Sequence, residues 1–139
     1  MTDEYGEFVS KNWPKDCNFQ PWEFLRSNIA ESFHIDNMIT NTDIWDNIIK
    51  LVTYVLQPAR ERFKAPIYIS SGYRCRQLNS KVGGAKNSYH IFGRAVDLYC
   101  SDLFKLEKVL KAVNDHNLKS HKPILKEFIV HQTYIHIAL

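Results

Sequence analysis

Residues 70–98 read SSGYRCRQLNSKVGGAKNSYHIFGRAVDL, and this stretch decides the fold because it joins a glycine-rich loop to a short apolar strand that carries one acid. Asp97 interrupts the apolar run, and His90 precedes it by seven positions, with Gly93 between them. A lone carboxylate among apolar neighbours is costly to bury unless it is paired or bound to a metal. Asp97 is therefore a metal ligand, a partner of Arg94 or a backbone cap, and its spacing to His90 favours the ligand.

A third ligand is available near the end of the chain, at His136. Zinc sites that perform chemistry usually have three protein ligands and leave the fourth position to water. His90, Asp97 and His136 have the donor types that such a site needs. The sequence therefore predicts a zinc site with an open position.

Short motifs follow one another through the same half of the chain: SGYR at 71–74, Asn79, VGG at 82–84, SYH at 88–90, GRAVD at 93–97 and IHI at 135–137. Together they resemble the zinc D-Ala-D-Ala carboxypeptidases and L-alanyl-D-glutamate endopeptidases that cleave bacterial cell-wall peptides, phage endolysins among them. The resemblance extends from about Pro58 to the last residue, with weaker features at 35–37 and 58–60.

The resemblance implies zinc as cofactor, bound by His90, Asp97 and His136, and peptidoglycan stem peptides as substrate. It also implies that Arg74 contacts the substrate, where its planar guanidinium suits a carboxylate or a developing oxyanion. Ser88 either hydrogen-bonds the substrate or only shapes the turn before His90.

One position departs from the family pattern. Many of the resembling enzymes have a Glu or Asp three residues before the last ligand histidine, as the general base that deprotonates the zinc-bound water, but this chain has Thr133 there. Threonine cannot act as that base near neutral pH. His131, five residues before His136, is our leading candidate, and Glu127 is the only acid on the same strand.

Composition is typical of one compact domain over residues 1–139, since 45% of the residues are apolar and 13% aromatic. The formal charge is 18 basic minus 15 acidic residues, or +3. So small and scattered an excess does not indicate nucleic-acid binding. We expect a monomer with an ordinary solvated surface.

The first residues, MTDEYGEFVSKNW, lack a basic segment followed by an apolar one, and no apolar run approaches 18 residues. We therefore expect synthesis in the cytoplasm without a signal peptide or transmembrane segment, and action on the cell wall after phage lysis or as part of a virion. The three cysteines, Cys17, Cys75 and Cys100, form no C-x-x-C pair, which predicts free thiols.

Apolar periodicity predicts an α+β fold in which helices pack on one face of a small antiparallel sheet. The expected helices are Pro21–Phe33, Asp43 to about Phe63 with Pro58 as a possible kink or end, Cys75–Val82, and one from Ser101 or Asp102 to about 114–117. The expected strands are Pro66–Ser70, Arg94–Tyr99, Ile124–His131 and Tyr134–Leu139.

The last two strands predict a hairpin with Gln132 and Thr133 as its loop. In that register Ile129 faces His136 and His131 faces Tyr134, and the period of two puts all four on one face. His131 is then a diagonal neighbour of a proposed zinc ligand.

Two functions agree with these features. The first is a zinc metallopeptidase that hydrolyses peptidoglycan stem peptides, as a carboxypeptidase or an endopeptidase, with a metal-activated water. The second is a non-catalytic relative that retains zinc and binds wall peptides or serves as a phage structural component, which Thr133 favours.

Overall fold

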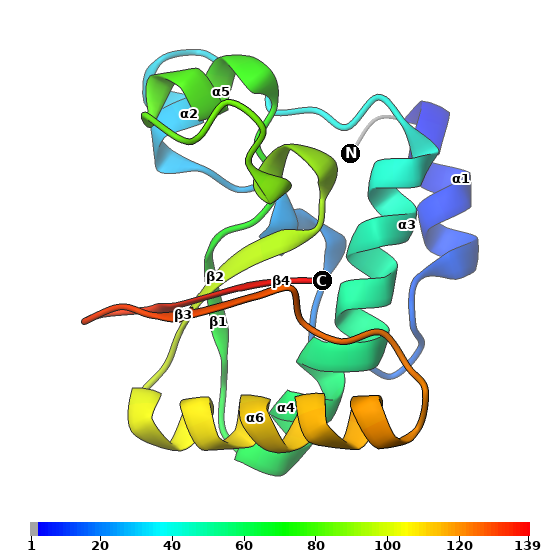
Figure 1. Ribbon diagram of the computed structural model, residues 1–139. Coiled ribbons are helices and arrows are strands. Elements are labelled where there is room, and N and C mark those ends of the chain that lie inside the picture. Colours follow the sequence, from blue (N-terminus) through cyan, green and yellow to red (C-terminus); the bar gives the residue numbers. More distant parts are fainter. Residues whose placement is uncertain (1–2) are drawn as a thin grey trace.

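The centre of the protein is a four-stranded antiparallel sheet with the strand order β1-β2-β4-β3 (Figure 1). The structure is a computed structural model, and it describes residues 3–139. The strands are β1 (Tyr68–Ser71), β2 (Ala95–Tyr99), β3 (Glu127–Val130) and β4 (Ile135–Ala138). β2 and β4 are the two central strands, so residues on them have a neighbouring strand on each side.

Helices make up about half of the protein, and most of them pack in the core on the apolar face of the sheet, whereas Ala30 and Leu78 belong to a separate small cluster. They are α1 (Asp3–Asn12), α2 (Asn28–Ser32), α3 (Thr42–Leu51), α4 (Gln57–Phe63), α5 (Arg76–Lys81) and α6 (Leu103–Lys119), with 3₁₀ turns η1 (Pro21–Phe24) and η3 (Tyr89–Phe92) and a π-helical turn η2 (Val52–Leu56). In Figure 1, α1 lies along α3, and α6 runs below the sheet beside α4. The predicted α+β class is confirmed.

Strand alternation separates the two faces of the sheet. Val96, Leu98, Ile135 and Ile137 are buried in one core with side chains of α3, such as Trp45. Asp97 and His136 occupy the intervening positions, so they belong to the opposite face. The polar residues singled out in the sequence therefore lie together on the face of β2 and β4 that the main core does not use.

The long helix predicted from Asp43 to Phe63 is confirmed as a continuous run of α3, η2 and α4 that passes through Pro58. Proline lacks an N–H, so the carbonyl of Tyr54, four residues earlier, loses its helical partner. Asn117 Nδ2 on α6 donates to that carbonyl at 2.8 Å. The π-helical turn and this hydrogen bond explain why Pro58 does not end the helix.

The single helix predicted over Pro21–Phe33 is wrong. The segment forms η1 and α2, separated by Ser27, whose backbone is extended and whose Oγ accepts from Ala30 N as a new N-cap. The carbonyl of Phe24 accepts from Tyr73 N at 2.7 Å instead of continuing a helix. A tertiary hydrogen bond and a capping serine therefore override the helical periodicity.

The predicted hairpin is confirmed. Ile129 pairs with His136, Val130 pairs with Ile135, and His131 N donates to Tyr134 O at 2.8 Å. Gln132 and Thr133 form the connecting turn, as the sequence predicted.

Two further predictions concern features outside the sheet. Cys17, Cys75 and Cys100 are free thiols, as expected. Across residues 3–139, none of the helices combines the length and the apolar character that crossing a membrane requires.

Candidate metal centre and substrate cleft

Strand register brings two of the predicted ligands side by side. Asp97 on β2 and His136 on β4 are direct cross-strand partners, and Ser71 on β1 pairs with Asp97 from the other side. The register of β1 shifts between Ile69 and Ser71, which leaves Ser70 as an extra residue. Such a bulge turns the end of an edge strand, and here it lies next to the acid of the site.

The third residue, His90, comes from the loop before β2 and lies on η3. Ser88 Oγ accepts from His90 N at 3.2 Å and caps this turn. Gly93 ends the turn with a φ of 70°, a conformation that glycine adopts at little cost. The cap and the left-handed glycine thus fix the direction in which the loop presents His90 to the sheet.

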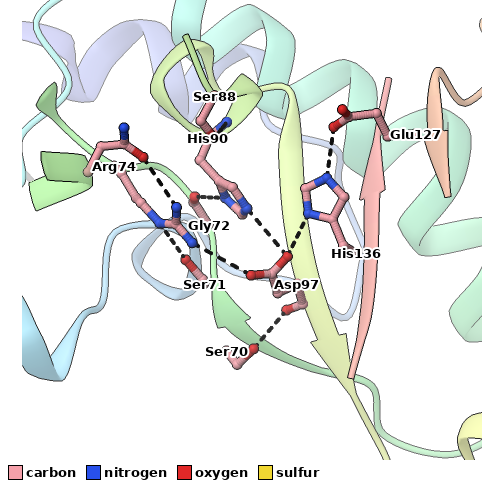
Figure 2. A network of polar contacts seen from close by, with 10 residues as sticks. Ser70, Ser71, Gly72, Arg74, Ser88, His90, Asp97, Glu127 and His136 are labelled. Atoms are coloured by element: carbon pink, nitrogen blue, oxygen red, sulfur yellow. Dashed lines mark hydrogen bonds and ion pairs between the residues drawn. The ribbon is translucent and has the colours of Figure 1, made fainter. Parts of the chain in front are cut away.

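The three side chains converge on one point (Figure 2). Asp97 Oδ1 lies 2.8 Å from His136 Nδ1 and 3.3 Å from His90 Nε2. One ligand atom from each of the three residues lies within 4.8 Å of the others. Within residues 3–139 this set has three members, which matches the ligand count of a catalytic rather than a closed structural zinc site.

The outward-facing ring nitrogen of each histidine also has a partner. His90 Nδ1 donates to the carbonyl of Gly72 at 2.7 Å, and His136 Nε2 donates to Glu127 Oε1 at 2.8 Å. Carbonyl–histidine and carboxylate–histidine pairs of this kind orient the rings of metal ligands and fix which nitrogen faces the metal. Sequence reasoning missed Gly72, because a backbone carbonyl leaves no signature in the sequence.

The chemistry of this donor set fits a cation. With Nδ1 donating to Gly72, His90 Nε2 faces the Asp97 carboxylate at 3.3 Å, and this contact needs a positive charge between the two atoms, either a proton on Nε2 or a metal ion. A divalent ion would supply that charge and use all three donors. His90, Asp97 and His136 would hold that ion.

Charges in the centre are strongly coupled. Burial alone would raise the pKa of Asp97, but hydrogen bonds with His136 and His90 outweigh it and hold the pKa of Asp97 well below its usual range. The hydrogen bond to Asp97 raises the pKa of His136; burial opposes this rise, and Glu127 adds to it. Asp97 is thus an anion at neutral pH, as a ligand for a cation must be.

Arg74 lies at the edge of the centre and is held by three groups. Its Nε donates to Ser71 Oγ and its Nη1 to Asn79 Oδ1, both at 3.2 Å, while Nη2 lies 3.7 Å from Asp97 Oδ2. Burial lowers the pKa of Arg74, and the charges of Asp97 and Tyr134 oppose that shift. Arg74 contributes to the lining of a cleft with Arg26, Ser27, Ser70 and Tyr73, so its guanidinium borders a space that a ligand can enter.

The remaining predicted residues differ in whether they contact the centre. Ser88 caps η3, which agrees with its proposed role in the turn. His131 is exposed near the hairpin turn and stacks on Tyr134 with ring centroids 4.3 Å apart. Glu127 contacts the centre, because its Oε1 accepts a hydrogen bond from His136 Nε2. The hairpin register alone did not predict this contact. Thr133 lies in the turn.

Comparisons with known proteins agree with this geometry. A family model described as Peptidase M15 matches residues 17–138, and the match includes every residue of the centre. A search of curated proteins gave no match.

Proposed function

The chain belongs to the M15 peptidases, the zinc peptidase family of D-Ala-D-Ala carboxypeptidase type, and from this membership we propose that it is a zinc-dependent hydrolase of peptidoglycan stem peptides. The observation that carries the proposal is the convergence of His90 Nε2, His136 Nδ1 and Asp97 Oδ1, with both outer ring nitrogens anchored. Zinc bound there would polarise the scissile carbonyl and acidify a water.

The protein's own groups position the peptide and move the proton. Arg74, fixed by Ser71 and Asn79, is placed to pair with a substrate carboxylate or with the oxygen on which charge develops. Ser88 contributes mainly by holding η3, and a hydrogen bond to the substrate remains a prediction. Because Glu127 is engaged with His136, we retain His131 as the residue that accepts the proton from the attacking water.

A second candidate is a non-catalytic relative that binds wall peptides, with zinc as a structural ion. Thr133 supports it, because the position of the usual carboxylate holds a group that cannot take a proton near neutral pH. The three-ligand set supports the enzyme, because structural zinc sites usually have four protein ligands.

The test is hydrolysis of defined muropeptides by the zinc-loaded protein, with products identified by mass spectrometry. We expect chelator-sensitive release of a peptide fragment or D-Ala, and no release by His90→Ala, which should also lose its equivalent of zinc by elemental analysis. If the zinc-loaded protein leaves the substrates intact at high concentration, the second candidate, a non-catalytic protein that binds wall peptides, becomes the better assignment. Full zinc content in His90→Ala would refute the ligand set.

A further inference from the structure

A row of aromatic rings crosses the open face of the sheet one pleat away from the metal centre. Tyr68 on β1 pairs with Tyr99 on β2. Asp97 pairs with His136 and Leu98 with Ile135, so the next step of the same register sets Tyr99 opposite Tyr134. The backbone N–H of His131 in turn donates a hydrogen bond to the carbonyl of Tyr134. We call Tyr68, Tyr99 and Tyr134 the aromatic row.

The row shares the face of the centre. Tyr99 follows Asp97 by two positions on β2, and Tyr134 precedes His136 by two positions, so alternation directs these side chains to the same side. Tyr99 lines a hollow with Arg26, Ser27 and Ser70, and these three residues also line the cleft that Arg74 borders. Tyr99 therefore adjoins the cleft beside the metal centre.

Two rings of the row are well exposed, and Tyr134 is half-buried. Tyr68 and Tyr99 stack with centroids 5.2 Å apart and remain 47% and 39% exposed, and Tyr134 stacks on His131 at 4.3 Å. Exposed aromatic side chains that adjoin one another mark binding surfaces more often than isolated ones do.

We propose that the aromatic row binds a sugar ring of the glycan strand to which the substrate peptide is attached. A pyranose has an apolar C–H face and a rim of hydroxyl groups, and tyrosine offers the complementary combination of an apolar ring and a polar tip. Tyrosine rings suit an uncharged sugar, while Arg74 suits the carboxylates of the peptide. This inference rests on the proposed function, because it assigns part of the substrate of the same site.

The position of the row also selects the bond that is cut. Two residues of a strand span roughly 6.6 Å, which is about the length of two extended peptide residues. A sugar on the row therefore places at the centre a peptide bond about two residues from the glycan. A terminal D-Ala-D-Ala bond, about four residues from the sugar, would lie roughly 13 Å away and beyond the centre. The inference favours an endopeptidase that cuts close to the sugar.

The first test measures binding without catalysis. An N-acetylglucosamine trimer, which has no peptide bond to cut, is titrated into the zinc-loaded protein, whose tyrosine rings carry an NMR label. We expect the ring signals of Tyr68, Tyr99 and Tyr134 to shift with saturation. Three tyrosines outside both the row and the cleft serve as internal controls and should not move; they are Tyr5, Tyr54 and Tyr89. Shifts at none of these six tyrosines, or at all of them equally, would overturn the sugar site.

The second test compares hydrolysis of one stem peptide with and without its attached disaccharide. We expect kcat/KM to be roughly tenfold higher for the sugar-bearing substrate, as one stacked ring can provide. Tyr99→Ala, and separately Tyr68→Ala, should bring this ratio toward one. Phe104→Ala is the matched control, because Phe104 on α6 is 70% exposed and lies outside the row.

The outcomes separate the two proposals. Equal kcat/KM for both substrates, or an unchanged ratio in folded Tyr99→Ala and Tyr68→Ala, refutes the sugar site while the peptidase remains. Cleavage of neither substrate refutes the peptidase. The sugar titration then shows by itself whether the row binds a sugar.

Discussion

Glu127 is the residue whose role changes most once the structure is known. By strand parity it shares a face with His131, but it is the one that reaches His136, at 2.8 Å. A carboxylate that accepts from the outer nitrogen of a ligand histidine orients the ring and increases its basicity. We therefore assign Glu127 to supporting the metal ligand rather than to accepting the proton of the water.

Glu127→Gln should weaken zinc binding by roughly 10- to 100-fold, because the amide keeps the shape of the side chain but loses the charge that supports His136. Titration against a chromophoric chelator measures this change. Glu107→Gln is the matched control, since Glu107 pairs with Lys111 on the surface of α6 and should leave zinc affinity unchanged. Equal zinc affinity in Glu127→Gln and the wild type would show that the contact does not support the ligand.

His131 is tested by turnover. If it accepts the proton, His131→Ala should lower kcat by roughly 10²- to 10⁴-fold with zinc content unchanged, the usual contribution of a general base. His116→Ala, at an exposed histidine of α6, is the control. Wild-type turnover in His131→Ala would remove it from the mechanism, and Thr133→Glu would then test whether the familiar position of the base can be rebuilt.

At the scale of single residues, the sequence predicted the three residues that converge at the centre from residue type, from the short spacing of His90 and Asp97, and from the motif around His136. Asp97 was detectable as one acid in an apolar strand, and His136 by its place in a second strand. The Gly72 carbonyl could not be predicted, because its use depends on how β1 approaches η3. The reach of Glu127 depends on a side-chain rotamer, which strand parity does not determine.

Among the elements, α3 positions the loop that carries His90. Asn47 Nδ2 donates to Phe92 O at 2.9 Å, and a Cβ built on Gly93 would lie 2.7 Å from the carbonyl of Ile44. Glycine at position 93 therefore serves both the left-handed conformation and the close approach of the two backbones. The distance between α3 and η3 depends on the absence of a side chain there.

Gly93→Ala should destabilise the protein by roughly 1–3 kcal/mol, because φ is positive and the added carbon meets backbone rather than a flexible side chain. Denaturant unfolding gives this value. Gly6→Ala is the control: position 6 lies inside α1, a Cβ there meets nothing within 4 Å, and alanine should stabilise by roughly 0.5–1 kcal/mol. If both variants had the same effect, packing at Gly93 would not explain its presence.

Element prediction succeeded where periodicity and tertiary contacts agree and was wrong where they conflict. The hairpin was predictable because its loop length determines its register. The Pro21–Phe33 segment has helical periodicity, yet Tyr73 captures the Phe24 carbonyl and Ser27 begins a new helix. No local pattern encodes a hydrogen bond between residues 24 and 73.

At the scale of the whole molecule, the metal centre joins segments that are distant in the chain. His90 comes from the loop after α5, Asp97 from a central strand and His136 from the last strand. An ion bound by all three stabilises the native state only, because the unfolded chain does not hold the ligands together. Zinc should therefore stabilise the entire fold and not only the site.

Zinc at about 100 times its dissociation constant should stabilise the protein by about 2.7 kcal/mol. For a domain of this size, that corresponds to a rise of roughly 10 °C in Tm, measured by circular dichroism after a chelator has removed the bound metal. Magnesium at the same concentration should give a much smaller shift, since two imidazoles suit zinc better than a hard cation. His90→Ala should lose the zinc shift, because it lacks a ligand and not because it is less stable. An equal shift in His90→Ala would mean that zinc binds elsewhere and that the three converging side chains do not form the metal centre.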